Sequence, residues 1–273
     1  MAFAGLLAIL AGAWTLRPDG ALPPPKGLRM TVLDVGQGDA TLLEVPEGAI
    51  LVDQGPPEAD VAGQLVRMGA GRLAALVLTH PSRDNIGGAR DLVERLDVDL
   101  VLEPALPFPN PYGGPALAEA RRRGIPIEVT RAGRTLALGR LRLRVLWPQE
   151  GASPDDDPND HATVLLATYG EVDALLPADA ESNVTLSLRP PPVELVKVAH
   201  HGSADPGLAE LLALLSPRLA LVSVGARNDY GHPTPSTLAV LAGFPGLRVY
   251  RTDEDGRITI ESDGQRISVH EER

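Results

Sequence analysis

The 273-residue sequence contains no cysteine. The protein therefore has no disulfide bond, and any metal that it binds must be held by nitrogen and oxygen ligands. A chain without thiols is compatible with an oxidising or a reducing compartment, so the absence of cysteine leaves the location open. Hydrophobic residues make up 44% of the chain, which is enough for the core of one large domain.

Positive charge is also scarce. Lysine occurs only at Lys26 and Lys197, and the formal net charge is −11 at pH 7. A surface of this charge repels the phosphates of nucleic acids. A nucleic-acid substrate would therefore need bound cations or a local arginine patch, such as "RRRG" at Arg121–Gly124.

The N-terminal apolar run is too short for a complete transmembrane helix. Residues 1–16 carry no charge, whereas a membrane span needs about 20 apolar residues. A secretory signal usually begins with Lys or Arg, which this segment lacks. A buried helix is the alternative, but we predict a membrane-associated segment, the end of a span in a longer protein. Residues 17–27, "RPDGALPPPKG", then form a stiff proline-rich linker, and residues 28–273 form the domain.

Short apolar runs from Leu28 onward predict strands, and amphipathic runs between them predict helices. We expect strands in 28–35, 40–45, 49–55, 73–80, 98–104, 125–130, 193–201 and 218–226, a hairpin in 134–148, two strands in 162–179, and further β-structure throughout 247–270. We expect helices in 58–69, 87–96, 114–124, 205–217 and 234–244. Because strands lie in both halves with helices between them, the fold class is α/β with mixed sheets.

Potential metal ligands follow the ends of four predicted strands. They are His80 and Asp84 after the first, Asp179 after the second, His200 and His201 after the third, and Asn228, Tyr230 and His232 after the fourth. Loops at strand ends are where a rigid sheet positions functional side chains. Imidazole nitrogen and carboxylate oxygen are the ligands that Zn²⁺ or Mn²⁺ would take here.

Each of these residues also has a structural interpretation. A single histidine at a strand end is more often hydrogen-bonded within the fold, and Asp179 alone fits the N-cap of a helix. His161, in "NDHATVLL", is as consistent with a surface residue as with a ligand. Two adjacent histidines before a tight turn, "HHGS", are costly to bury without a purpose. The order of the clusters along the chain therefore indicates a site more strongly than any one residue.

This order resembles the metallo-β-lactamase fold and, more narrowly, the soluble domain of ComEC-type DNA-uptake channel proteins. The motifs that carry the resemblance are "LDVGQGDATLLE", "ILVDQG", "LTHPSRDNIGG", "LLPADAE", "VKVAHHGS" and "SVGARNDYGHP". The resemblance implies a four-layer αβ/βα sandwich with two mixed β-sheets and two metals at one edge. It also fits the apolar N-terminus, since in that family the domain follows membrane helices.

The resemblance implies roles for individual residues. The metal ligands are expected among His80, Asp84, Asp179, His200, His201 and His161, and the catalytic residues are Asp84, Asp179 and Arg83. Substrate contacts are expected from Gln37, Asp39, Ser203, Asn228, Tyr230 and His232, and Asp53 matches a structural acid beside the site. The family's metal motif, His-x-His-x-Asp-His, is degenerate in this sequence.

Ser82 and Asn85 stand where the family motif has histidines, and the middle position is often Asp in the ComEC-like branch. A hydroxyl and an amide carbonyl are neutral and weaker donors for a transition metal. Three ligands remain for one metal, namely Asp84, Asp179 and either His200 or His201. We therefore expect one divalent metal, Zn²⁺ or Mn²⁺, and at most two.

Two functions follow from the sequence. The first is a metal-dependent hydrolase with weakened metal binding, a phosphodiesterase or nuclease that acts on the non-transported single strand of DNA during uptake. In it, Arg83 could hold a phosphate. The second is an inactive scaffold or DNA guide beside a membrane channel formed by the same or a longer protein. In either case we expect a membrane-associated protein with this domain outside the cytoplasm.

Overall fold

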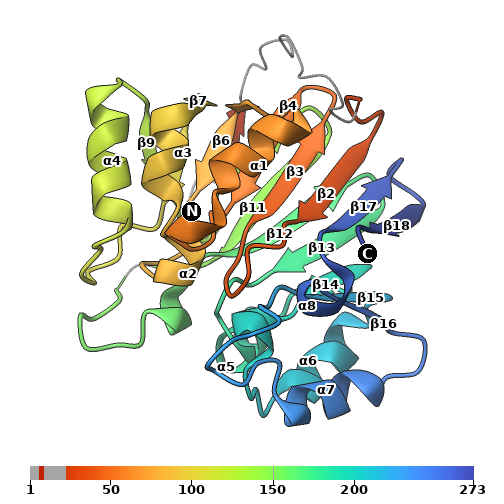
Figure 1. The fold of residues 1–273 in the computed structure, drawn as a ribbon. Coiled ribbons are helices and arrows are strands. Elements are labelled where there is room, and N and C mark those ends of the chain that lie inside the picture. The colour runs from red at the N-terminus through yellow and green to blue at the C-terminus, as the bar shows by residue number, and fades with distance from the viewer. Residues whose placement is uncertain (1–5, 9–22, 150) are drawn as a thin grey trace.

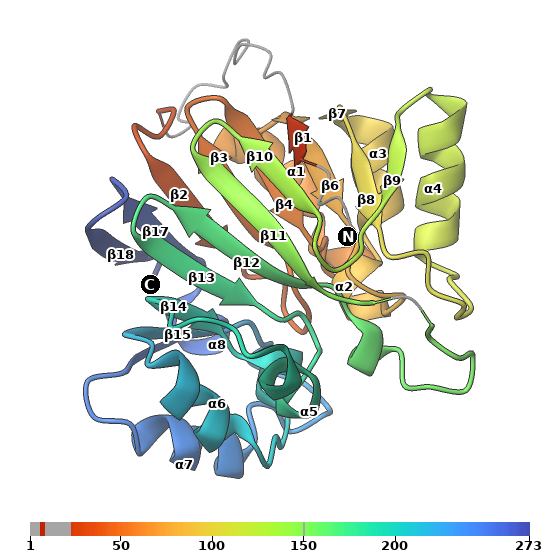
Figure 2. The same cartoon turned by 180° about the vertical axis from the view of Figure 1, so that it is seen from behind.

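The computed structural model describes residues 6–8, 23–149 and 151–273. Within these residues the chain forms two large mixed sheets that pack face to face, with helices on both outer sides (Figures 1 and 2). The predicted four-layer αβ/βα sandwich with two mixed β-sheets is confirmed.

The first sheet contains, in spatial order, β18 (Ile267–Glu271), β17 (Ile258–Ser262), β2 (Leu28–Val32), β3 (Thr41–Val45), β4 (Gly48–Val52), β6 (Ala75–Val77), β8 (Val101–Glu103) and β9 (Ile127–Val129). Its strands are antiparallel from β18 to β4 and parallel from β4 to β9. The predicted meander at the start of the domain therefore forms this sheet's antiparallel half.

The second sheet contains β1 (Leu6–Ala8), β10 (Thr135–Leu138), β11 (Leu141–Trp147), β12 (Val164–Tyr169), β13 (Val172–Leu176), β14 (Leu195–Lys197), β15 (Leu219–Val222) and β16 (Arg248–Arg251). It is antiparallel from β10 to β13 and parallel from β13 to β16. A separate pair joins β5 (Arg72–Leu73) to β7 (Asp97–Val98).

The helices are α1 (Val61–Met68), α2 (Arg83–Ile86), α3 (Ala89–Arg95), α4 (Gly113–Arg122), α5 (Ser182–Thr185), α6 (Leu208–Leu215), α7 (Pro235–Ala242) and α8 (Thr252–Asp255). Short 3₁₀ helices are η1 (Pro57–Ala59), η2 (Asn159–His161), η3 (Leu186–Leu188) and η4 (Ala199–Gly202). Helices α1, α3 and α4 pack on the first sheet, and α5, α6 and α7 pack on the second.

Helix α1 shows how the sequence sets these layers. The Asp60 side chain accepts a hydrogen bond from the backbone N–H of Gly63 and so begins the helix. The helix ends at Gly69, whose φ of 82° is costly for a residue with a Cβ atom. Leu65 and Met68 share the buried face, as the spacing predicted. Every residue of β2 and β3 is also buried, because both faces of the first sheet are covered there.

The C-terminal region differs from the prediction of β-structure throughout 247–270. Helix α8 interrupts it, and the chain changes sheets there, since β16 belongs to the second sheet and β17 to the first. The acidic residues Asp253, Glu254 and Asp255 occupy the first turn of α8. Acidic side chains are favourable at the N-terminal end of a helix. The prediction for 247–270 followed the pattern of apolar residues and did not use this signal.

The predicted membrane-associated segment, residues 1–16, and most of the predicted linker lie outside the described residues. The exceptions are Leu6–Ala8, which pair in parallel with β10, and residues 23–27. Within the described residues, no helix is long and apolar enough to cross a membrane.

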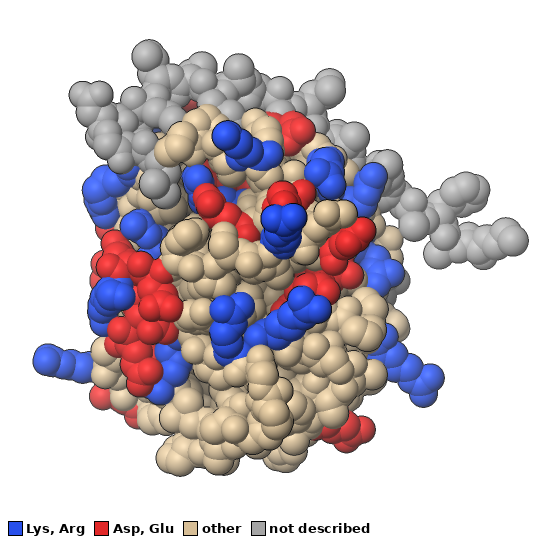
Figure 3. Space-filling model, turned by 90° about the vertical axis from the view of Figure 1, so that its right-hand side faces the viewer, with Lys and Arg blue, Asp and Glu red and all other residues tan. Residues whose placement is uncertain are grey.

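The sequence has 36 acidic and 25 basic residues, and both kinds lie on the surface. On the face drawn in Figure 3, Asp and Glu side chains gather along one side and Lys and Arg side chains are scattered among them. The predicted arginine patch at Arg121–Gly124 lies at the end of α4. There Arg122 pairs with Glu119, and Arg123 donates to the carbonyl oxygens of Val93 and Leu96. Two of its three guanidinium groups are therefore engaged within the fold.

Candidate functional site

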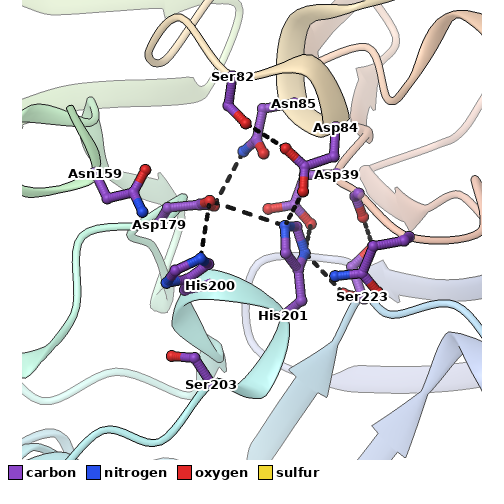
Figure 4. Close-up of polar contacts among 12 residues, drawn as sticks. Asp39, Ser82, Asp84, Asn85, Asn159, Asp179, His200, His201, Ser203 and Ser223 are labelled. Atoms are coloured by element: carbon purple, nitrogen blue, oxygen red, sulfur yellow. Dashed lines mark hydrogen bonds and ion pairs between the residues drawn. The ribbon is translucent and has the colours of Figure 1, made fainter. Parts of the chain in front are cut away.

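The ends of strands from both sheets meet at one edge of the sandwich. The loop after β6 brings His80, Asp84 and Asn85, and the loop after β13 brings Asp179. The turn after β14 brings His200 and His201 to the same place (Figure 4). The predicted convergence of these loops is therefore present in the structure.

The Asp179 carboxylate lies at the centre of this cluster. Its Oδ2 atom is 3.5 Å from Nε2 of His80, 3.8 Å from Nε2 of His201 and 3.9 Å from Nε2 of His200. Its Oδ1 atom accepts a hydrogen bond of 3.1 Å from the Asn85 amide. Asp179 is buried, and it is not a helix N-cap, because Glu181 occupies that position before α5.

A chain of hydrogen bonds orients the His80 ring. The Asp53 carboxyl group accepts from the Thr79 hydroxyl at 2.8 Å, from the Thr79 backbone N–H and from the Asn85 amide. The single hydroxyl hydrogen of Thr79 then points to Asp53, so its oxygen accepts from Nδ1–H of His80 at 3.1 Å. Nε2 of His80 is left facing Asp179, and it has no hydrogen-bond partner. Partners of this kind fix the tautomer of metal-binding histidines.

His201 is oriented in the same manner. Its Nδ1–H donates to the backbone carbonyl of Ser223 at 3.0 Å, because a carbonyl oxygen can only accept. Its Nε2 is buried without a hydrogen-bond partner and lies 3.4 Å from Oδ2 of Asp84. Both His200 and His201 have left-handed backbones, with φ of 48° and 54°. This turn directs both rings toward the edge, which the predicted strand over 193–201 did not anticipate.

The cluster is electrostatically coupled. Burial disfavours the charged imidazole, but the Asp179 and Asp39 carboxylates outweigh it and raise the pKa of His201 to about 9. Burial likewise opposes charge on His80, yet Asp179 raises the pKa of that ring as well. Burial and the Asp39 carboxylate raise the pKa of Asp53 to about 7. Against its own burial, the nearby His201 and His80 rings hold the pKa of Asp179 well below its usual range.

His200 is more exposed than His201 and has a carboxylate partner of its own. Its Nδ1 lies 3.1 Å from Oε1 of Glu181, and this hydrogen bond raises the pKa of His200. Ser203 donates to the same Glu181 oxygen. The adjacent histidines therefore have different surroundings, one buried beside Asp84 and one half-buried beside Glu181.

Ser82 and Asn85 take part in the cluster as hydrogen-bond donors. The Ser82 hydroxyl donates to Asp84, and the Asn85 amide bridges Asp53 and Asp179 with bonds of 3.1 Å each. Sequence reasoning treated both only as weak metal ligands. In the structure the Asn85 amide instead donates to Oδ1 of Asp179.

Two pairs of donor atoms in the cluster have the spacing of ligands on a divalent metal. Donor atoms around a tetrahedral zinc ion lie about 3.3 Å apart, because each is about 2.0–2.1 Å from the metal. The pairs His201–Asp84 and His80–Asp179 are separated by 3.4 and 3.5 Å, and each contributes an unpartnered Nε2. Within the described residues, no group of three or more His, Asp and Glu side chains is already arranged as a metal shell. Metal binding would therefore require these side chains to adjust.

A buried ion pair forms the base of the site. Lys197 contacts Asp39, and both side chains are only 3% exposed. Asp39 is also 3.7 Å from His201, so Lys197 compensates a carboxylate next to a metal-ligand candidate. Sequence reasoning missed this role, although a lysine inside the apolar run "VELVKVA" is a signal for a buried partner. Gln37 accepts from the backbone N–H of Gly225 and so joins the same loop to the end of β15.

Two predicted site residues point elsewhere. Nε2 of His161 contacts the Asp156 carboxylate at 3.0 Å, and its ring stacks on Trp147. The Arg83 guanidinium forms an exposed ion pair with Glu58 at 2.7 Å. Among the described residues, no hydrogen bond or ion pair joins either side chain to the Asp179 cluster, so their predicted roles as ligand and catalytic residue rest on sequence alone.

Asn228, Tyr230 and His232 lie at the mouth of the cluster. The His232 ring centroid is 5.6 Å from that of His200 and 5.8 Å from that of Tyr230. Burial and the neighbouring His200 lower the pKa of His232. The loop after β15 therefore borders the cluster, as expected for substrate contacts.

Gly38 allows the loop that carries Asp39 to lie against the loop that carries Asp84. Its φ is 140°, and a Cβ atom there would be 2.2 Å from the backbone oxygen of Asp84. We expect Gly38→Ala to lower the free energy of unfolding by about 2–3 kcal/mol through strain and displacement of that loop. Denaturant unfolding measures the loss.

Gly36→Ala is the matched control for this change. Gly36 also has a positive φ, 70°, but nothing lies within 4 Å of a Cβ placed there. Only the backbone cost of about 1 kcal/mol is expected at that position. Equal losses in the two variants would contradict a close approach of the two loops.

Comparison with known proteins agrees with this geometry. The model of the metallo-beta-lactamase superfamily matches residues 33–226. ComE operon protein 3 of Bacillus subtilis is 29% identical over 255 residues, which cover 83% of this chain and 32% of that protein. Recombination protein 2 of Haemophilus influenzae is 28% identical over 255 residues, covering 90% of this chain and 30% of that protein. The chain thus spans about a third of the length of these curated relatives.

Solved structures share the fold at low sequence identity. CmlA, a diiron beta-hydroxylase from Streptomyces venezuelae, has a TM-score of 0.59 at 17% identity, over 87% of this chain and 55% of that chain. The metallo-beta-lactamase fold protein YhfI from Bacillus subtilis has a TM-score of 0.57 at 12% identity, over 83% of this chain and 96% of that chain. Both likenesses concern the fold alone. The resemblance seen in the sequence is confirmed at the level of the family, and the chain belongs to the metallo-beta-lactamase superfamily.

Proposed function

We propose that the domain is a metal-dependent phosphodiesterase that cleaves single-stranded DNA and that its metal binding is weakened by Ser82 and Asn85. One observation carries the proposal. Two buried imidazoles, His80 and His201, turn unpartnered Nε2 atoms toward the Asp179 carboxylate, and their other nitrogens are held by hydrogen bonds. Burying two such nitrogens is costly unless a ligand or a proton satisfies them.

The residues that would hold the metal are Asp84, Asp179 and His201, with His80 on the other side of Asp179. A bound divalent ion would lower the pKa of its water ligand and polarise the phosphoryl group. Asp53, through Thr79, keeps the Nε2 of His80 facing Asp179. Lys197 neutralises Asp39 behind His201, so the net negative charge around the cluster is reduced.

His200 is placed to act on the substrate. It is the more exposed ring of the pair, with 31% of its side chain accessible, and Glu181 orients it through Nδ1. Because this hydrogen bond favours the protonated ring, His200 can deliver a proton to the leaving oxygen of the phosphodiester. A phosphate could reach the Arg83 guanidinium only by displacing Glu58 from its exposed ion pair.

Single-stranded DNA and a membrane-associated, extracytoplasmic location complete the proposal. They are supported by the relatives named ComE operon protein 3 and Recombination protein 2. The remainder of a longer protein, or a separate membrane channel, would be the partner that delivers the strand.

An inactive scaffold is the alternative, and the Asn85 amide favours it. That amide donates to Asp53 and Asp179 at once, and Ser82 donates to Asp84, so the carboxylates are partly satisfied without a metal. A cluster held by such bonds could keep the fold of the edge after the chemistry has been lost.

Metal content and DNA cleavage test the proposal together. We expect the purified protein to carry about one metal per chain or less, as for a three-ligand site. We expect Mn²⁺ or Zn²⁺ to support cleavage of a single-stranded oligonucleotide, and a chelator to stop it. His201→Ala should lower metal affinity and cleavage by about 10- to 100-fold.

Two other histidines are compared in the same assay. His270 is exposed in the C-terminal strand, so His270→Ala is the control and should leave the metal content unchanged. His161→Ala tests the predicted ligand role of His161, and its engagement with Asp156 leads us to expect no change in metal content. A protein that binds no metal and cleaves no DNA under these conditions would favour the scaffold.

A further inference from the structure

Tyr230 presents an aromatic ring to solvent beside the catalytic edge. Its exposed fraction is 68%, the highest among the exposed large hydrophobic side chains of the described residues. Its ring lies 5.8 Å from the His232 ring, which lies 5.6 Å from the His200 ring. A row of three rings therefore leads from the neighbour of Asp179 to the surface.

The loop that carries Tyr230 is held in place. The Asn228 amide donates to the carbonyl oxygens of Gly225 and His232 at 2.9 and 2.7 Å, and its oxygen accepts from the backbone N–H of His232 at 3.0 Å. One half-buried side chain thus closes both ends of the turn. The backbone that carries the exposed ring is therefore held in place, which lowers the entropic cost of ordering this loop when a ligand binds.

The other aromatic rings near this edge are already engaged. The Trp147 indole donates to the carbonyl of Asp160 at 2.7 Å and stacks on His161. Phe108 is buried against the same histidine. Tyr230, in contrast, is 68% exposed.

We propose that Tyr230 is a stacking platform for an unpaired nucleobase one or two nucleotides from the scissile phosphodiester, and that it makes the site selective for single strands. The inference rests on the proposed function and deepens it. Bases of every kind have a π-face that can stack on an aromatic ring, whereas paired bases in a duplex do not present theirs. The net charge of −11 gives the protein little electrostatic affinity for phosphates, so stacking is a physical source of affinity that remains available.

The test compares Tyr230→Ala with Tyr230→Phe in the full chain with Mn²⁺. For a single-stranded oligonucleotide we expect the alanine variant to raise KM by about 5- to 100-fold with little change in kcat, as loss of one stacked base predicts. The phenylalanine variant keeps the ring and should match the wild type. On an oligonucleotide with abasic sites flanking the scissile bond, all three proteins should have the same KM. The preference for single over double strands should shrink in Tyr230→Ala alone.

A binding measurement separates this inference from the proposed function. An oligonucleotide containing 2-aminopurine should lose fluorescence on binding wild type and Tyr230→Phe, and keep it with Tyr230→Ala. This quenching decides the inference even if the wild type cleaves no DNA, which would overturn the proposed function alone. Absence of quenching in the wild type, or equal losses by Tyr230→Ala on normal and abasic oligonucleotides, would overturn the stacking role.

Discussion

The double change Ser82→Asp, Asn85→His should raise the metal content from about one to about two ions per chain. It replaces two hydrogen-bond donors by a carboxylate and an imidazole at the positions where the family motif has ligands. It also removes the amide that occupies Oδ1 of Asp179. We expect DNA cleavage to rise by on the order of 10²- to 10³-fold, the range that one preorganised charge-stabilising group contributes. Elemental analysis and cleavage of a single-stranded oligonucleotide measure the two effects.

Single variants and an added Asp179→Ala change are the controls for this experiment. Asn85→His alone frees the Asp179 carboxylate and should give most of the gain in metal, whereas Ser82→Asp alone leaves the amide in place. Asp179→Ala in the double variant should abolish metal binding and cleavage, because this carboxylate contacts all three histidines of the cluster. Asn85 is fully buried, so folding of each variant must be checked by denaturant unfolding. If a folded double variant gains no metal, the scaffold becomes the better explanation.

Much of the fold could be predicted from the sequence because its strands are continuous apolar runs and its helices have a clear amphipathic period. The same runs indicated which loops converge, since ligand-type residues followed directly after four of them. The sequence could not show where each side chain points. The left-handed backbones of His200 and His201 decide which ring is buried, and no apolar pattern encodes them.

The sequence also could not predict which hydrogen-bond partners the side chains of the site have. Asn85 was expected to be a weak ligand, yet its amide nitrogen faces two carboxylates. Arg83 belongs to the same short motif as Asn85, but its guanidinium forms an exposed ion pair with Glu58. His161 is likewise held by Asp156. In each case the orientation of the side chain is set by a partner that lies outside the sequence motif but close in space.

The metal-free protein should become less stable as the pH rises from about 6.5 to about 9, and a bound metal should oppose this loss. The folded-state pKa of His201 is raised to about 9 from an ordinary value of 6.5, so its contribution is fully present below 6.5 and disappears as the pH rises through 9. Asp53, whose pKa is raised from 3.8 to about 7, acts with the same sign, but its contribution is lost mainly below this window. Since one pKa unit corresponds to about 1.4 kcal/mol, the loss is on the order of 3 kcal/mol.

A metal bound at Nε2 of His201 takes the place of the proton, so stabilisation by Mn²⁺ should grow with pH over the same window as competition from protons declines. Urea unfolding between pH 6.5 and 8.5, with chelator or with Mn²⁺, should therefore show slopes that diverge. His201→Gln cannot titrate and should flatten the metal-free slope, whereas the exposed His270→Ala should preserve it. The opposite result would be a metal-free wild type whose stability increases between pH 6.5 and 8.5. It would contradict a protonated His201 beside Asp179. It would also remove the physical basis for exchange of a proton for a metal ion at this histidine.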